Sequence, residues 1–347
     1  MTFFRSAPRS FDAAARDLGD RRPAVRLAAV RDVVRHAEDH RAEIVRQLVG
    51  LLGEQEPDAA VRAAAAFGLA DLKAAEAVPA LLGAAQDDSD EVRQAALCAL
   101  GEVGDERAEP LCSTALGDPA PAVRFQAVMA YARVCSERER AVAALVRATE
   151  DEDPEICQLA LRMAEELGPD PAQAGRAVPP ALLARARALL EHTSPAVRLA
   201  SAIIVARSGE ADGDELLCAA VEGRLVTNQA DDEAAAIELC GERRLQAATV
   251  ALERRAFGSR LSLRQDPFAW QARVALLQLG HPRALGWVLA DLRSRSRERR
   301  TLAIAAAGRG KVETARGLLE QMKGRASAAE SEAVQEALAA LGEHRPK

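Results

Sequence analysis

One short phrase recurs along this chain, and its spacing constrains the fold more than any other feature. The phrase is a valine followed by an arginine and a run of small apolar residues. The arginines of its strong copies are Arg26, Arg62, Arg93, Arg124 and Arg198, and Cys157 takes the same place in a weaker copy. The successive intervals are 36, 31, 31, 33 and 41 residues. A period of about 30–40 residues is typical of proteins that stack pairs of helices.

A second helical pattern lies between these phrases, for example over residues 43–52 and 76–85. Each unit is therefore expected to contain a first helix, a short acidic turn and a second helix that carries the Val-Arg pair. Pro154 and Pro195 follow an aspartate and a serine, which suits a helix N-cap with proline at the first helical position. Second helices are expected to end near Gly101, Gly104 and Gly168. Only 3% of the residues are aromatic, and alanine-rich segments favour helices over sheets.

The best-matched units also resemble a known family. Residues 77–82 (Ala-Val-Pro-Ala-Leu-Leu) and 90–105 carry this resemblance. They resemble the HEAT-repeat family, and within it the short bacterial units known as PBS-lyase HEAT-like repeats. The match is strong over about residues 20–208; later segments keep the helical phase but lose the Val-Arg pair. We therefore expect an all-α fold: a right-handed α-solenoid, or superhelix, of about ten HEAT-like helix pairs, with capping units at its ends.

Three parts of the chain are expected from this pattern. Residues 1–168 hold the N-terminal HEAT-like repeats. Residues 169–180 are rich in proline and predict an irregular linker within the solenoid. Residues 181–347 hold the more degenerate C-terminal repeats with a cap.

The recurring arginine predicts a structural role. It lies in the first turns of a helix, where a positive charge opposes the helix dipole, so a recurring partner is expected. The candidate partners are the turn aspartates Asp58, Asp88, Asp90 and Asp118. The hypothesis is a ladder of ion pairs between neighbouring units, as the family resemblance also implies. Its arginines are Arg26, Arg62, Arg93, Arg124 and Arg198. The alternative is that each arginine is a solvated surface charge.

Charge is distributed unevenly along the chain. The net charge is +3 over residues 1–50, −19 over 51–242 and +10 over 243–347, within a total of −6. A basic patch in the last segment is a candidate for binding nucleic acid or another anionic ligand. Its arginines are Arg243, Arg244, Arg254, Arg255, Arg260, Arg264, Arg293, Arg295, Arg297, Arg299 and Arg300. Trp270 and Trp287 lie in apolar helical runs, which favours core packing over base stacking.

A stripe of large apolar residues on the second helices is a candidate groove for a partner. Helical spacing places these residues opposite the valine and the paired alanines. They are Phe67, Leu97, Phe125, Val128, Met129, Leu199 and Ile203. The alternative is that tight stacking buries them in the core.

The sequence contains little that indicates catalysis. It has no G-x-S-x-G elbow, Walker loop or G-x-G-x-x-G motif. His36 and His40 lie four residues apart, but no third ligand is evident nearby, so we expect no metal and no cofactor. The six cysteines form no C-x-x-C pair and are expected to be free thiols in a reducing cytoplasm. No apolar run approaches ~18 residues, so no membrane insertion is expected.

These observations favour a cytoplasmic, non-catalytic scaffold or adaptor that binds another protein, of unknown identity, along an extended concave surface. The first alternative is binding of nucleic acid or an anionic ligand through the arginine-rich C-terminal region. The second is cofactor attachment, because the chromophore-lyase branch of the resembled family attaches bilins to antenna proteins. That resemblance concerns the repeat that forms the scaffold, so we do not expect an enzyme.

Overall fold

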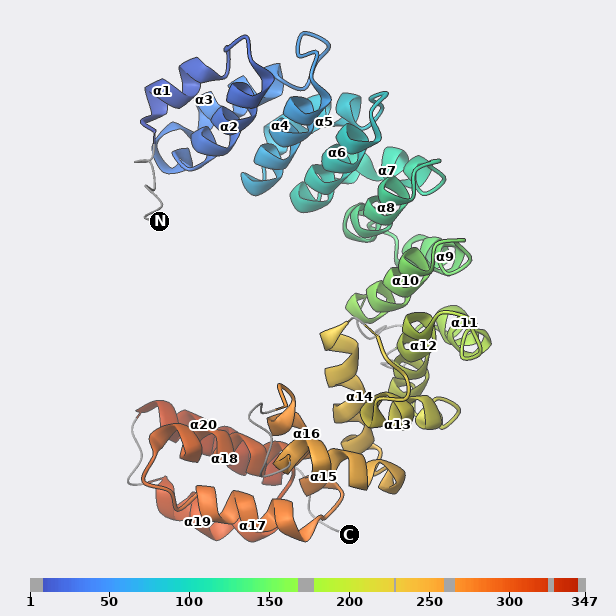
Figure 1. Ribbon diagram of the computed structural model, residues 1–347, viewed down its shortest axis with the longest axis vertical. Coiled ribbons are helices and arrows are strands. Elements are labelled where there is room, and N and C mark those ends of the chain that lie inside the picture. The colour runs from blue at the N-terminus through green and yellow to red at the C-terminus, as the bar shows by residue number, and fades with distance from the viewer. Residues whose placement is uncertain (1–8, 168–177, 228, 259–265, 324–327, 343–347) are drawn as a thin grey trace. The chain divides into compact units, whose positions relative to one another are not determined.

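The computed structural model describes residues 9–167, 178–227, 229–258, 266–323 and 328–342, and within them it is entirely helical (Figure 1). Contacts divide the chain into two compact units, Met1–Arg185 and Ala186–Lys347. Helix α11 (Pro180–Ala188) spans the boundary. Most of the expected linker, residues 169–177, lies outside the described residues.

The first unit contains five pairs of helices in chain order. A first helix comes before each second helix, and short 3-10 turns precede two of the first helices. The pairs are α1 (Phe11–Asp17) and α2 (Pro23–Val34); α3 (Ala37–Gly50) and α4 (Ala59–Asp71); α5 (Val78–Ala84) and α6 (Asp90–Val103); α7 (Glu109–Ala115) and α8 (Pro121–Val134); α9 (Arg138–Ala148) and α10 (Pro154–Glu166).

The same alternation continues after α10. The pairs are α11 and α12 (Pro195–Arg207); α13 (Asp214–Glu222) and α14 (Ala230–Glu242); α15 (Thr249–Phe257) and α16 (Ala269–Gln278); α17 (Pro282–Asp291) and α18 (Arg297–Arg309); α19 (Arg316–Met322) and α20 (Ala328–Gly342). The described residues thus contain ten helix pairs, which confirms the expected α-solenoid.

Local sequence explains where the second helices begin and end. The Asp58 carboxylate accepts the Val61 N–H and caps α4, and proline occupies the first turn of α8, α10 and α12. Gly104 ends α6 in the left-handed conformation at φ 70°, as expected for a helix C-cap. Gly101 lies inside α6 and does not end it, so that expectation was wrong; Gly168 lies outside the described residues.

Small residues bring second helices of neighbouring repeats close together. A Cβ atom on Gly101 of α6 would lie 3.0 Å from the Ala130 Cα of α8. The corresponding distance is 2.8 Å between Gly308 of α18 and the Ala337 Cα of α20. Only glycine permits such an approach without displacing a helix. These glycines therefore hold neighbouring repeats in contact along their second helices.

Each unit has its own hydrophobic cluster. One cluster extends from Phe11 to Ala144, and the other from Leu199 to Leu341. Alanine, leucine and valine dominate both, which agrees with the low aromatic content of the sequence. None of the described helices combines the length and the apolar character needed to cross a bilayer.

Candidate docking face and the ladder that positions it

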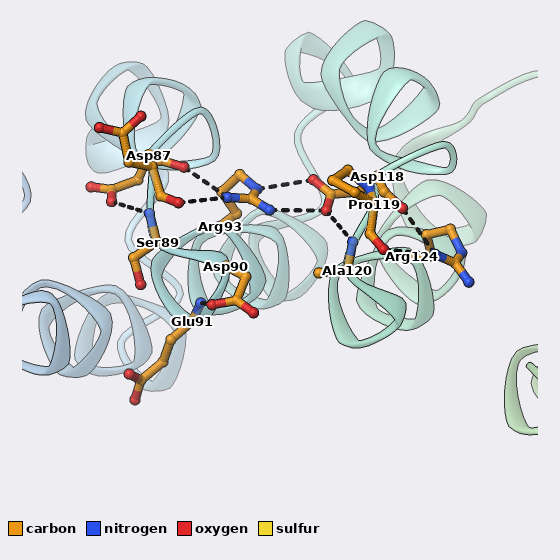
Figure 2. Close-up of polar contacts among 10 residues, drawn as sticks. Asp87, Ser89, Asp90, Glu91, Arg93, Asp118, Pro119, Ala120 and Arg124 are labelled. Atoms are coloured by element: carbon orange, nitrogen blue, oxygen red, sulfur yellow. Dashed lines mark hydrogen bonds and ion pairs between the residues drawn. The ribbon is translucent and has the colours of Figure 1, made fainter.

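Three arginines in the first unit make the same set of contacts. The Arg93 guanidinium donates from Nε to Asp118 Oδ2 and from Nη2 to Oδ1, both at 2.9 Å (Figure 2). Its Nη1 donates to the Asp87 carbonyl at 3.0 Å. Arg62 pairs with Asp87 at 2.8 Å for both bonds, and Arg124 pairs with Asp151 at 2.8 and 2.9 Å.

Each turn therefore serves two arginines. The Asp118 carboxylate accepts hydrogen bonds from Arg93 of the preceding repeat. The Asp118 backbone carbonyl accepts a hydrogen bond from Arg124 Nη1 of its own repeat at 3.0 Å. The same carboxylate accepts the Ala120 N–H at 2.9 Å, which fixes the turn before α8. A bidentate pair sets angle as well as distance, so consecutive repeats are held in one orientation.

The pair at the N-terminal end of this ladder uses glutamate. Arg26 donates to Glu56 at 2.6 and 2.5 Å, and the two side chains are only 9% and 3% exposed. Arg26 Nη1 also donates to the Asp20 carbonyl at 2.8 Å. We call each such arginine, with its side-chain partner and its carbonyl partner, a rung of the ladder. Every guanidinium in the series thus binds a side chain of the next turn and a carbonyl of its own.

These contacts shift the ionisation of the aspartates. Hydrogen bonds from Arg62 are the largest cause that holds the pKa of Asp87 below its ordinary value; burial opposes them and the Ser89 N–H adds to them. For Asp118, burial is the largest single influence and acts to raise the pKa. Bonds from Arg93 and the Ala120 N–H outweigh burial, so the pKa of Asp118 is also lowered.

The partners differ in part from those expected. Asp118 is the partner of Arg93, but Asp58 caps α4, Asp88 offers Arg93 only its carbonyl, and the Asp90 side chain accepts the Glu91 N–H. Sequence reasoning missed three carboxylates, Glu56, Asp87 and Asp151. A usable signal was present, because an acidic residue lies six positions before Arg26, Arg62, Arg93, Arg124 and Cys157, whereas His192 holds that place before Arg198. The acidic residues are Asp20, Glu56, Asp87, Asp118 and Asp151.

The pattern changes at α10 and returns near the end of the chain. The Cys157 thiol contacts the Thr149 carbonyl at 3.4 Å, and Arg185 of α11 donates to the Thr149 hydroxyl at 3.0 Å. Arg198 donates to the His192 carbonyl at 2.9 Å. In the second unit, Arg300 pairs with Glu330 at 2.8 and 3.1 Å and donates to the Ser294 carbonyl at 2.9 Å.

Arg300 therefore resembles a ladder residue in its choice of partners, although both of its side-chain bonds go to one oxygen, Glu330 Oε1. The sequence had placed it in the basic patch. Two other patch members also form ion pairs: Arg243 with Asp214 at 2.6 Å, and Arg255 with Glu233 and with Asp266. Arg260 and Arg264 lie outside the described residues. The remaining members are exposed, in three separate segments: Arg244, Arg254, and the set Arg293, Arg295, Arg297 and Arg299.

The expected groove residues divide into two groups. Four of them are only 0–3% exposed and pack in the core: Leu97, Val128, Leu199 and Ile203. Phe125 and Met129 are partly exposed, and Phe67 is 43% exposed. The candidate docking face is therefore narrower than the stripe expected from the sequence.

Two of the three accessible residues fall at one repeat position, and Phe125, which directly follows Arg124, does not. Phe67 and Met129 each lie five residues after a ladder arginine, on α4 and α8. Cys98 of α6 occupies the same position and is half-buried. We call Phe67, Cys98 and Met129 the apolar row. Because α4 packs against α6 and α6 against α8, these three side chains come from neighbouring helices.

Charged residues border this row. Asp71, Glu102 and Arg133 lie four residues further along the same three helices, and Arg133 forms an ion pair with Glu102. An apolar centre beside a polar edge is the usual composition of a protein-binding surface. Sequence reasoning missed Cys98, because the stripe was traced through large side chains alone.

The candidate reactive groups lie in structural settings. The Phe11 ring stacks on His40 at 3.8 Å, and His36 Nε2 lies 3.0 Å from the Arg9 carbonyl. All six cysteines are free thiols, and burial raises the pKa of Cys112 to about 12 and of Cys157 to about 11. Among the described residues no group of three or more metal-ligating side chains converges.

Comparison with known proteins identifies the repeat. The family model described as HEAT repeats matches residues 12–100 and again 84–168. No curated protein matches the sequence. Similar solved structures include the following three.

Importin beta is 12% identical, with 95% of this chain and 50% of that chain covered at a TM-score of 0.49. A designed armadillo repeat protein in complex with the peptide (KR)4 is 17% identical, with 58% and 100% covered at 0.45. The complex of CpcE and CpcF of phycocyanin lyase from Nostoc is 18% identical, with 82% and 96% covered at 0.40.

Proposed function

We propose that this chain, whose residues 12–168 match the HEAT-repeat family model, is a non-catalytic scaffold that binds another protein. HEAT-repeat solenoids typically act by presenting an extended surface rather than by catalysis. The partner docks on the second helices of the first unit, along the apolar row.

The observation that carries this proposal is the exposure of the apolar row. Phe67 is 43% exposed in a unit whose other large apolar side chains are mostly buried. Covering an aromatic ring and a flexible methionine removes apolar surface from water, at about 25 cal/mol per Å². Methionine also adapts its shape to a partner side chain. The ladder contributes by holding α4, α6 and α8 in fixed positions, which lowers the ordering cost of binding.

The test compares a face variant with a matched control. We expect Phe67→Ala/Met129→Ala to lose most of the protein recovered with the wild-type chain from its native extract, measured by quantitative mass spectrometry. Val250→Ala removes a side chain that is 70% exposed on α15, a first helix, and should retain the partner. Circular dichroism confirms that each variant is folded. Equal recovery by the face variant and the wild type would contradict the proposal.

A second candidate function is nucleic-acid binding through the segment between α17 and α18 together with the first turn of α18. The observation in its favour is that Arg293, Arg295, Arg297 and Arg299 are all exposed. Ion pairs at Arg243, Arg255 and Arg300 oppose it, because they neutralise charge that would otherwise meet phosphate. This function predicts DNA or RNA binding that weakens steeply with salt and is lost in Arg295→Gln/Arg297→Gln/Arg299→Gln.

Bilin attachment, the lyase-like alternative, is tested by absorbance of the purified protein after incubation with a bilin.

A further inference from the structure

The second unit contains a cavity that none of the functions above uses. Its volume is about 390 Å³, and its lining comes from three second helices, α14, α16 and α18. Glu238 and Glu242 come from α14, Trp270 and Gln278 from α16, and Arg309 from α18. An aromatic ring, two carboxylates and a guanidinium therefore border one space.

Trp270 is held in place by a hydrogen bond, and the Arg309 guanidinium lies over its ring. Its indole Nε1 donates to the Leu302 carbonyl at 3.3 Å, which fixes the ring against α18. The Arg309 guanidinium carbon lies 5.2 Å from the ring centroid, within the range of a cation–π contact. Gln278 Nε2 donates to the Arg309 carbonyl at 3.1 Å and links α16 to the end of α18. Trp270 is thus a preformed platform for a flat positive group.

The two carboxylates have no cation of their own. Glu238 and Glu242 lie four residues apart on one face of α14, both are exposed, and neither forms an ion pair with any described residue. This contrasts with Glu56 and Glu330, which are engaged by ladder arginines. Two unpaired carboxylates on the wall of a cavity attract a positive ligand and repel phosphate.

We propose that this cavity binds the arginine side chain of an extended partner segment. The guanidinium stacks on Trp270 and donates to Glu238 and Glu242, because its planar fork serves a ring face and carboxylates together. Leu302, whose backbone carbonyl accepts the Trp270 Nε1–H, is 45% exposed and offers an apolar side chain to a neighbouring residue of the segment. The site lies in the second unit and is independent of the apolar row, so either proposal can fail alone.

Arg309 regulates access to this site. Its own guanidinium covers the ring that the ligand needs, and its charge opposes that of the ligand. An incoming arginine must displace it from Trp270. Replacing Arg309 by glutamine therefore increases affinity, a direction that distinguishes this site from a structural contact.

The experiment uses the full chain carrying Trp287→Phe, so that Trp270 is its only tryptophan. The probe is an acetylated (Gly-Arg)4 peptide, titrated at low salt while Trp270 fluorescence is recorded. The matched ligand control replaces each arginine by citrulline, which keeps the shape and removes the charge. We expect saturable quenching with the arginine peptide and none with the citrulline peptide.

Two pairs of glutamates provide the protein control. Glu238→Gln/Glu242→Gln should weaken binding by about tenfold or more, and Arg309→Gln should strengthen it by roughly threefold. Glu332→Gln/Glu336→Gln removes the same charge at the same spacing on α20 and should change affinity by less than about twofold. The proposal is overturned by equal effects of the two glutamate pairs, by equal binding of the citrulline peptide, or by no saturable quenching.

Discussion

At the scale of single residues, the defining feature is an arginine that joins two turns. An isolated surface ion pair contributes little, because water screens it and two long side chains lose entropy. The rungs differ, since each guanidinium is largely buried and also binds a backbone carbonyl of its own repeat. Removing one partner leaves a carboxylate and a carbonyl unsatisfied together.

The first prediction concerns one rung. Arg93→Met should lower the free energy of unfolding by about 1.5–3 kcal/mol. The substitution deletes hydrogen bonds to a charged group and leaves the Asp118 carboxylate without its ion-pair partner. Arg107 pairs with Asp105 within a single exposed turn, and Arg107→Met should cause no measurable change. Urea unfolding followed by circular dichroism measures both. Similar losses in the two variants would show that the rungs are ordinary surface pairs.

The second prediction concerns acid. The pKa of Asp87 is lower in the folded chain than its ordinary value of 3.8, so the stability from its ionised form is present above that value. This stability disappears as the pH falls below about 4 through the folded pKa. Asp87→Asn lacks this contribution at every pH and should lose less stability than the wild type between pH 6 and pH 3. Parallel losses would contradict the role of Asp87.

The sequence located the arginines but not all of their partners. A recurring arginine near a helix start predicts a recurring partner, and that partner exists for Arg26, Arg62, Arg93 and Arg124. Choosing among several acidic residues in one turn needs the backbone geometry. Asp87 can bridge two repeats because its side chain also accepts the Ser89 N–H, whereas Asp88 meets Arg93 only through its carbonyl.

At the scale of helices, close contact between second helices organises the repeats. The period and the caps predicted the helix pairs well, since both are local properties of the chain. The role of Gly101 was not predictable in this way. A glycine near the end of a helical pattern suggests a C-cap, and only the position of Ala130 on the next helix shows that it is a contact point.

A pair of glycines in one repeat gives the third prediction. A Cβ on Gly308 would lie 2.8 Å from the Ala337 Cα, so Gly308→Ala should destabilise by about 1–3 kcal/mol. Gly286 lies within α17 with no atom inside 4 Å of such a Cβ. Gly286→Ala should stabilise by about 0.5–1 kcal/mol, because alanine favours the helix. Urea midpoints measure both, and a neutral or stabilising Gly308→Ala would refute the close contact.

Burial on the second helices could be predicted only in part. Helical spacing places Leu97 and Phe67 on related faces, but it does not show how closely the next repeat approaches. Leu97 is fully buried while Phe67 is 43% exposed. The candidate docking face therefore depends on how neighbouring helices pack together, and the spacing within one helix predicted more exposed residues than the structure has.

At the scale of the whole chain, the division into two compact units has a consequence for unfolding. Each unit has its own hydrophobic cluster, and repeat arrays lose cooperativity when neighbouring contacts are weak. Both tryptophans lie in the second unit, so their fluorescence reports that unit alone, whereas far-ultraviolet circular dichroism reports both. We expect different urea midpoints from the two signals. Superimposable curves would show that the units unfold as one.

The central claim is that a partner protein contacts the apolar row of the first unit. Placing the photo-crosslinking residue p-benzoylphenylalanine at position 67, at 129 or at the control position 250, in the native cell, tests it most directly. The account predicts one partner of the same mass crosslinked from positions 67 and 129, and none from 250. Crosslinks from 250 alone, or the same products from all three positions, would contradict it.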